Sequence, residues 1–250
     1  MSVRPGDGDG PAMRVRRVTT TRKGGASQSP YDEFNLGDHV GDDPDAVRAN
    51  RTRLAEKIGV GPDRMVWMEQ IHSRNVVIVD GPRDEPVPAT DALVTTVGDL
   101  ALVVVTADCV PVLLSDDTAG VIGAAHAGRI GARIGIIPRL LEAMISCGAR
   151  PERIGGFLGP AASGEKYEVP ADMQADVEAH LPGSASRTDR GTPGLDLRAG
   201  IRRQLLAAGV PAVAQDPRCT ITDPTLFSHR RGAPTGRLAS VIWMDTSGRA

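Results

Sequence analysis

The sequence predicts an α/β protein with mixed sheets (α+β), and two observations carry this prediction. Short runs rich in Val, Leu and Ile, bounded by Gly, Pro or Asp, recur along the 250 residues and predict strands. Helical patterns separate some of these strands, whereas other strands follow one another directly. This order favours mixed sheets over one parallel, doubly wound sheet.

The clearest strand signals lie in the middle of the chain. Three apolar runs, at residues 102–105, 110–114 and 121–126, lack polar alternation, as expected for buried strands. We also expect residues 66–70 and 76–79 to form a pair of strands. Further strands are expected at residues 13–21, 92–96, 154–158, 210–214 and 238–244.

Apolar periodicity and capping signals predict helices at residues 45–58, 130–147, 170–181 and 197–208. Pro44 gives the first of them a start and Gly59 a stop. Pro138 lies inside the second helix and predicts a kink or a delayed start. Asp196 is expected to cap the last helix. Residues 183–194 lack apolar periodicity and are expected to form a mobile loop.

Composition restricts the class of protein. A net charge of −2 and a pI near 6.2 give no general electrostatic reason to bind nucleic acid or an anionic membrane. No apolar run approaches the roughly 18 residues of a membrane-spanning helix. Three cysteines without an export signal indicate a reducing compartment, so we expect a cytoplasmic protein. Residues 1–12 predict a disordered leader and residues 13–250 a single domain, either monomeric or homodimeric.

Three residues near the ends of predicted strands are candidates for a metal site. Cys109 follows one buried strand, His126 closes another, and His72 follows a third apolar run. Two histidines and one cysteine are a known set of zinc ligands, which leaves a fourth position for water or substrate. Their long separations in sequence neither support nor exclude convergence. Taken alone, Cys109 could also be a small core residue.

Short motifs along the chain resemble those of the laccase-domain family. In order they are QIHS at 70–73, TADCVPVLL at 106–114, AAHAG at 124–128 and LGP at 158–160. The family is also described as multicopper polyphenol oxidase-like, and some members as purine nucleoside phosphorylases or peptidoglycan editing factors. The resemblance implies a four-layer α/β/β/α sandwich of two intertwined halves. It also implies that His72, Cys109 and His126 bind one catalytic zinc per chain.

The same resemblance implies a zinc-dependent enzyme that acts on purine nucleosides. The expected reactions are adenosine deamination and phosphorolysis of adenosine, inosine, guanosine or methylthioadenosine. Zinc suits deamination because it lowers the pKa of bound water to about 7. Asp108 is expected to move the proton, which adds it to the three metal ligands as a catalytic residue. Family-like motifs or available cations nominate six substrate-binding residues: Asn35, Arg51, Gln70, Tyr167, Arg22 and Arg230.

Two positions depart from the usual motifs of the resembled family. The family usually continues HAG with Trp-Arg-Gly, where this chain has Arg129-Ile130-Gly131. It often has Cys at the position of Lys166. Arg129 either replaces the contact of the missing Trp ring or turns to solvent.

Other functions stay open at this level. Cys109 and His126 could form the nucleophile and base of a cysteine hydrolase or deamidase, with His72 uninvolved. A peptidoglycan-precursor editing or quality-control protein could instead hold a structural zinc, with Cys219 or His229 as the fourth ligand. Multicopper phenol oxidation is nearly excluded, because the chain has five histidines and a multicopper cluster needs many more. Copper could still enter the zinc site adventitiously.

Overall fold

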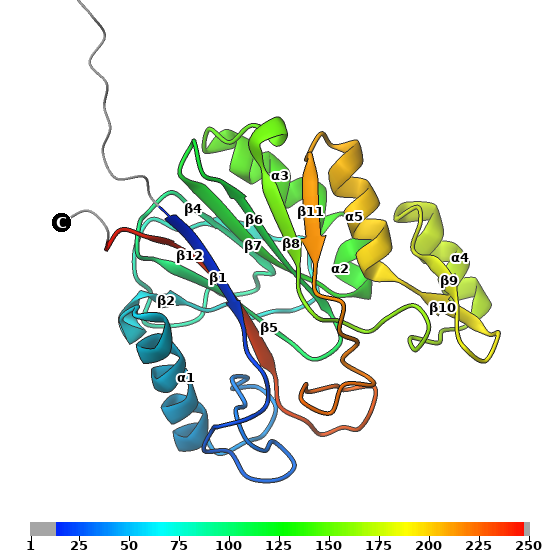
Figure 1. Ribbon diagram of the computed structural model, residues 1–250, viewed down its shortest axis with the longest axis horizontal. Helices are drawn as coiled ribbons and strands as arrows, with labels where there is room; N and C mark the ends of the chain where they lie inside the picture. Colours follow the sequence, from blue (N-terminus) through cyan, green and yellow to red (C-terminus); the bar gives the residue numbers. More distant parts are fainter. Residues whose placement is uncertain (1–13, 248–250) are drawn as a thin grey trace, which may run out of the picture.

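Two β-sheets lie face to face at the centre of the structure, and helices cover their outer faces (Figure 1). The computed structural model describes residues 14–247, so the leader predicted at residues 1–12 lies outside the described residues. The layers run helix, sheet, sheet, helix. This arrangement confirms the predicted four-layer sandwich with mixed sheets.

The first sheet has four strands in the order β1-β12-β5-β2. Their bounds are Arg14–Thr19 for β1, Leu238–Asp245 for β12, Ala101–Thr106 for β5 and Met65–Val66 for β2. Strand β12 is antiparallel to both β1 and β5, whereas β2 is parallel to β5. Helix α1 (Pro44–Ile58) covers the outer face of this sheet, where Leu54 packs among Val103, Val241 and Trp243.

The second sheet has six strands in the order β11-β8-β6-β7-β4-β3. Their bounds are Ala212–Gln215 for β11, Gly155–Leu158 for β8, Val110–Asp116 for β6, Val121–Ala127 for β7, Ala92–Thr95 for β4 and Val76–Ile78 for β3. Its outer face packs against helices α2 (Arg129–Arg133), α3 (Ile136–Ser146) and α5 (Leu197–Ala207). Helix α4 (Ala171–His180) lies beside a hairpin of β9 (Ala185–Arg187) and β10 (Pro193–Leu195). Short 3-10 helices occupy Pro62–Arg64 and Pro151–Arg153.

Apolar side chains from both sheets fill the space between them. Leu102 and Ile242 enter it from the four-stranded sheet, and Leu93, Leu113 and Ile122 from the six-stranded sheet. All five are at most 1% exposed. Because β-strands alternate their side chains, the opposite faces of the same strands are free to bury apolar residues against the helices.

Capping explains where the helices begin and end. The Asp43 side chain accepts a hydrogen bond from the N–H of Asp45, and α1 ends at Gly59, whose φ of 72° suits glycine. The predicted helix at 130–147 is split in two by Gly135, which has a φ of 93°. Pro138 lies in the first turn of α3, which is the delayed start that the sequence allowed. Among the described residues, no helix is long and apolar enough to cross a membrane.

Two expectations about local structure are wrong. Residues 66–70 and 76–79 do not pair: β2 joins the four-stranded sheet, whereas β3 joins the six-stranded one. The cause is tertiary, because the chain crosses between the sheets in this segment. The loop predicted at 183–194 contains the β9–β10 hairpin, which the Gln174 amide stabilises by donating to the carbonyls of Ser186 and Gly194.

The chain passes between the sheets at two places that matter for function. Residues 67–75 lead from β2 to β3, and residues 107–109 lead from β5 to β6. The first crossing carries His72 and the second carries Cys109. His126 lies near the end of β7, the neighbour of β6. The fold therefore brings the three residues together through its crossings.

The core between the sheets gives a stability prediction. Replacing Leu113 with Ala removes apolar contacts and leaves a cavity, so we expect the free energy of unfolding to fall by about 2–5 kcal/mol. The matched control is Leu206→Ala on α5, whose side chain is 38% exposed; it should change stability by about 0.5 kcal/mol or less. Urea denaturation measures both, and equal effects would contradict the assignment of the core.

Candidate functional site

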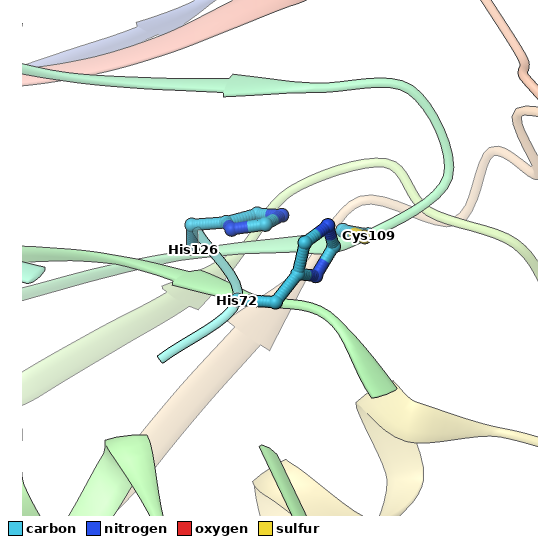
Figure 2. A group of neighbouring side chains, drawn as sticks. All are labelled: His72, Cys109 and His126. Atoms are coloured by element: carbon cyan, nitrogen blue, oxygen red, sulfur yellow. The ribbon is translucent and has the colours of Figure 1, made fainter. Parts of the chain in front are cut away.

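His72, Cys109 and His126 form a cluster, which we call the His-Cys-His cluster. Their potential ligand atoms all lie within 4.8 Å of one another. Figure 2 shows the three side chains converging from separate segments of the chain. The two imidazole rings are 4.7 Å apart between centroids, with an angle of 65° between their planes.

A buried carboxylate, that of Asp91, orients both histidines. Its Oδ1 atom accepts hydrogen bonds from Nδ1 of His126 at 2.8 Å and from the N–H of His72 at 3.1 Å. Its Oδ2 atom accepts from the N–H and Oγ of Ser73, at 2.6 and 2.7 Å, and from the N–H of Ile71 at 3.2 Å. Because Asp91 engages Nδ1 of His126, that ring has its Nε2 atom available for a metal.

The hydrogen bonds to Asp91 also determine its charge. Burial raises the pKa of Asp91, but the hydrogen bonds from His126 and Ser73 outweigh burial and hold this pKa below its usual value. The carboxylate is therefore ionised at neutral pH. A fixed negative charge behind a histidine ligand is a common arrangement in metal sites.

Backbone geometry makes room for the cluster. His72 has a φ of 61°, an unusual value for a residue with a side chain, and the Asp91 carboxylate holds the amides on both sides of it. Gly128 follows the strand that carries His126. A Cβ atom at Gly128 would lie 2.5 Å from Nδ1 of His72 and 3.0 Å from Sγ of Cys109. Glycine is therefore needed here for the two side chains to approach.

The donor set fits a bound metal ion. Two imidazoles and a thiol are ligands that zinc and copper both accept, and the carboxylate of Asp91 supplies the expected second partner of one imidazole. Neither Cys219 nor His229 joins the cluster in the described part of the chain. Cys219 instead accepts the N–H of Ser163 at 3.3 Å. The three residues predicted as ligands thus lie together, and the alternative with Cys219 or His229 as a fourth ligand gains no support from the described residues.

The cluster opens onto a cavity of about 290 Å³, which we call the cluster cavity. Besides the three cluster residues, its described lining residues are His39, Gln70, Val105, Thr106, Ala107, Asp108, Arg129, Tyr167, Leu197, His229, Arg230 and Arg237. The Arg230 guanidinium lies over the Tyr167 ring, 4.9 Å from its centroid. Burial and the Cys109 sulfur raise the pKa of Tyr167, while Arg129 and Arg230 oppose the rise, so its hydroxyl is protonated at neutral pH.

Two of the predicted site residues in this cavity are fixed by hydrogen bonds. Oδ1 of Asp108 accepts from Oγ1 of Thr220 at 2.6 Å, and Oδ2 accepts from the N–H of Arg230 at 2.7 Å. The Gln70 amide bonds both the N–H and the carbonyl of Val105, each at 2.8 Å. Gln70 therefore ties the segment that carries His72 to the end of the strand that leads to Cys109.

Three other predicted substrate-binding residues, Asn35, Arg51 and Arg22, are not among the described lining residues of the cluster cavity. Asn35 is 0% exposed, and its amide holds the backbone of Gly37 and Arg237. Arg51 donates to the carbonyl of Leu36, pairs with Asp38 and stacks on Trp67.

Arg22, the third of these residues, pairs with Asp32 at 2.8 Å and lies over Phe227. Internal partners therefore engage all three side chains, through the Asn35 amide and through Nε and Nη2 of both arginines.

Three residues at the site were not predicted from the sequence as site residues: Asp91, which bonds His126, and Thr106 and Arg237, which line the cluster cavity. Asp91 directly precedes a buried strand, and a single acid in that position carries no periodic signal. Thr106 was noted only as the first residue of the motif TADCVPVLL and was given no role. Arg237 lies a few residues beyond the family-like segment that contains Arg230, outside every motif. One weak sequence signal could have indicated two of them. Asp91 and Thr106 are polar residues at the ends of apolar runs, as Cys109 is.

The orientation by Asp91 gives a prediction. In Asp91→Asn, the amide can no longer offer two anionic oxygens, so we expect zinc affinity to fall roughly 10- to 100-fold. Competition with a chromophoric chelator measures this, with Cys109→Ala as the reference for loss of a ligand. The control Asp80→Asn removes a carboxylate whose side chain is 92% exposed and should leave affinity unchanged. Equal affinities for Asp91→Asn and the wild type would contradict the role of Asp91.

A second prediction concerns pH. Burial disfavours a charged His126, but the Cys109 sulfur and Asp91 outweigh burial and raise the pKa of His126 to about 9. Burial and His126 lower the pKa of His72, so His72 is neutral and adds no proton.

A metal must displace the His126 proton, so zinc affinity should rise about tenfold per pH unit up to pH 9 and level off above it. Chelator competition at pH 6.5, 7.5 and 8.5 tests the slope. A pH-independent affinity would show that His126 is not a ligand.

Comparison with known proteins places the chain in a family. The family model described as multi-copper polyphenol oxidoreductase laccase matches residues 16–245. A Mycobacterium bovis protein named purine nucleoside phosphorylase is 59% identical over 240 residues, which are 96% of each chain. A protein of that name from Corynebacterium glutamicum is 60% identical over 232 residues, or 92% of this chain and 94% of the relative.

Solved structures agree with these matches. YlmD from Geobacillus stearothermophilus superposes with a TM-score of 0.86 and 33% identity, covering 92% of both chains. A Neisseria meningitidis protein superposes with a TM-score of 0.82 and 36% identity, covering 92% of this chain and 94% of that one. The resemblance inferred from the motifs is confirmed: this chain belongs to the laccase-like family described as multi-copper polyphenol oxidoreductase laccase.

Proposed function

We propose that this protein is a zinc-dependent purine nucleoside phosphorylase that also deaminates adenosine. One observation carries the proposal: the His-Cys-His cluster opens onto a cavity that also holds Tyr167 and three guanidinium groups. Such a cavity offers an aromatic face for a purine and cations for phosphate. The name of the relatives at 59 and 60% identity supports the same substrate class.

We assign one zinc per chain to His72, Cys109 and His126, with copper as an adventitious substitute. When bound there, zinc would supply a Lewis acid beside the cavity. Multicopper oxidation is not proposed, because the chain has five histidines and only two of them join the cluster. We further propose that residues 13–250 act as one cytoplasmic domain, a monomer or a homodimer, with small molecules as partners rather than nucleic acid or membranes.

Phosphorolysis requires the cavity to hold phosphate beside the ribose. A phosphate oxygen forms a bond to C1′ while the C1′–N9 bond breaks and its electron pair leaves with the purine. The proton that phosphate loses balances the one that the purine gains. In this reaction Tyr167 packs on the base, and Arg230, which lies over its ring, approaches the sugar and phosphate. Adenosine, inosine, guanosine and methylthioadenosine all carry the required bond.

Deamination of adenosine is favoured by a separate feature, the carboxylate of Asp108 in the same cavity. A water oxygen adds to C6, and ammonia leaves with the electron pair of the C6–N bond. Asp108 carries the proton from water to the departing amine. Its two oxygens are held by Thr220 and by the N–H of Arg230, which directs the remaining lone pairs into one fixed arrangement.

Two alternatives differ from this proposal in what they require of the cluster. A cysteine hydrolase or deamidase would use Cys109 with His126 and would not need His72. The Asp91 carboxylate bonds the His126 ring and the backbone N–H of His72, and the two rings and the Cys109 thiol lie within ligand distance of one another, which supports a metal. A protein that edits peptidoglycan precursors would bind them in the same cavity without acting on nucleosides.

The test is product analysis with four nucleosides. Zinc-loaded protein is incubated with adenosine, inosine, guanosine or methylthioadenosine, with and without phosphate, and products are separated by chromatography. We expect adenine and ribose 1-phosphate from adenosine when phosphate is present, and inosine without it. Asp108→Asn should slow deamination roughly 100- to 10,000-fold and phosphorolysis much less, because only deamination moves a proton through this carboxylate.

Chelation and a second substrate class provide the controls. Removing zinc should stop deamination, and adding it back should restore the activity. Activity that survives verified zinc removal would instead favour the cysteine dyad. If none of the four nucleosides reacts and a hydroxyphenol is also inert, the peptidoglycan-precursor function becomes the better explanation.

A further inference from the structure

The cluster cavity contains more positive than negative side chains. Among its described lining residues are three arginines, Arg129, Arg230 and Arg237, whereas Asp108 is the single carboxylate. A partly enclosed cavity lined by charges of one sign attracts ligands of the opposite sign. The cavity is therefore suited to an anion.

The cavity arginines differ from other arginines in their partners. Within residues 14–247, neither Arg129 nor Arg237 forms an ion pair with a carboxylate. Arg22 and Arg51, by contrast, pair with Asp32 and Asp38. Arg133, Arg153 and Arg218 also each form an ion pair with an aspartate. The charges of Arg129 and Arg237 are thus available to a ligand.

The backbone of Arg237 is fixed before any ligand arrives. Its N–H donates to Oδ1 of the buried Asn35 at 2.8 Å, and its carbonyl accepts the N–H of Leu36 at 3.1 Å. A Cβ atom at Gly37 would lie 2.6 Å from Cγ of Arg237, so glycine makes room for the arginine stem. Its Nη1 atom donates to the carbonyls of Thr235 and Gly236. Such fixing lowers the entropic cost of binding.

The surroundings of Arg237 place it beside the catalytic residues. Burial lowers the pKa of Arg237, and the charges of Cys109 and Asp108 oppose that effect. The Nε and Nη2 atoms of Arg237 have no hydrogen-bond partner within the described part of the chain. A guanidinium with free donors in this position matches the oxygens of a tetrahedral anion.

Thr106 supplies an independent observation. Its side chain is 2% exposed and lines the cavity, yet its Oγ1 atom has no hydrogen-bond partner among the described residues. Buried hydroxyl groups without a partner are uncommon, and each calls for an explanation such as a ligand. An oxygen atom of a bound anion would satisfy this hydroxyl.

We propose that Arg129, Arg237 and Thr106 form the binding site for inorganic phosphate in the cluster cavity. The inference deepens the proposed function by naming the residues that hold its second substrate. It replaces Arg22 and Arg51, two of the three cations nominated from the sequence, whose guanidinium groups already pair with aspartates, and it leaves the third, Arg230, beside Tyr167. It also gives Arg129, which stands where the family usually has Trp, a direct role in binding.

Direct binding of phosphate tests this site without requiring turnover. Radiolabelled inorganic phosphate is dialysed to equilibrium against zinc-loaded, full-length protein at constant ionic strength. Because each arginine contributes a charge-assisted hydrogen bond, Arg129→Gln and Arg237→Gln should each raise the dissociation constant roughly 10- to 100-fold. Thr106→Val keeps the shape of the side chain and should raise it roughly two- to tenfold.

Matched variants keep the result interpretable. Arg139→Gln removes an exposed arginine of α3 and should bind phosphate like the wild type. Arg51→Gln removes the competing candidate. Its guanidinium reaches Arg237 only through the backbone of Leu36, so any weakening of phosphate binding should be much smaller than that of Arg237→Gln. Zinc content and thermal melting are measured for every variant, and the isosteric Thr106→Val tests the site even if Arg237→Gln fails to fold.

Each outcome decides the proposal. Weakened binding in the Arg129, Arg237 and Thr106 variants alone supports it. Unchanged binding in all three, or weakening by Arg51→Gln instead, overturns it. A parallel experiment uses adenosine 5′-monophosphate in place of inorganic phosphate. If the arginine variants weaken binding of this ester but leave binding of inorganic phosphate unchanged, the proposal is also overturned. Arginine-dependent phosphate binding without nucleoside turnover would sustain the site and refute the proposed enzyme.

Discussion

The site depends on the burial of one carboxylate. Asp91 is 0% exposed and accepts hydrogen bonds from His126, from Ser73 and from the amides of residues 71–73. An ionised carboxylate without partners would cost several kcal/mol to bury, so its surroundings must supply donors. The donors are the segments that carry His72 and His126. Stabilising this charge and assembling the His-Cys-His cluster are therefore one structural requirement.

The four-layer architecture explains why these segments meet. His72 and Cys109 lie in the two crossings that lead from the four-stranded to the six-stranded sheet, and His126 lies on β7 beside β6. Backbone hydrogen bonds to residues 87–92 hold parts of the first crossing, and side chains bond the backbone between them. Asp91 does so for the first crossing, and Asp108 receives the Thr220 hydroxyl at the second. The residues that could hold a metal and the side chains that support the backbone thus occupy the same short segments.

Sequence reasoning located most of the strands because their signals are local, and family-like motifs nominated the three residues that form the His-Cys-His cluster. The apolar runs before Cys109 and up to His126 are continuous, and Asp43, Pro44 and Gly59 delimit α1 by capping chemistry. The partners of the ligands could not be found in this way. Asp91 is separated from His126 by 35 positions, and its role arises only when two segments meet. The β9–β10 hairpin was missed for a related reason, since its stability depends on contacts with α4.

The motif residues Gln70 and Asn35 show how a residue can serve a site without touching its ligand. Gln70 uses its amide to hold Val105, and so positions the turn that carries Asp108 and Cys109. Asn35 is fully buried and holds the N–H of Arg237, whose guanidinium lines the cavity. Because a buried amide must satisfy all its polar atoms, Asn35 tolerates few replacements. Both residues act on the site through the backbone they hold, Gln70 at Val105 and Asn35 at Arg237.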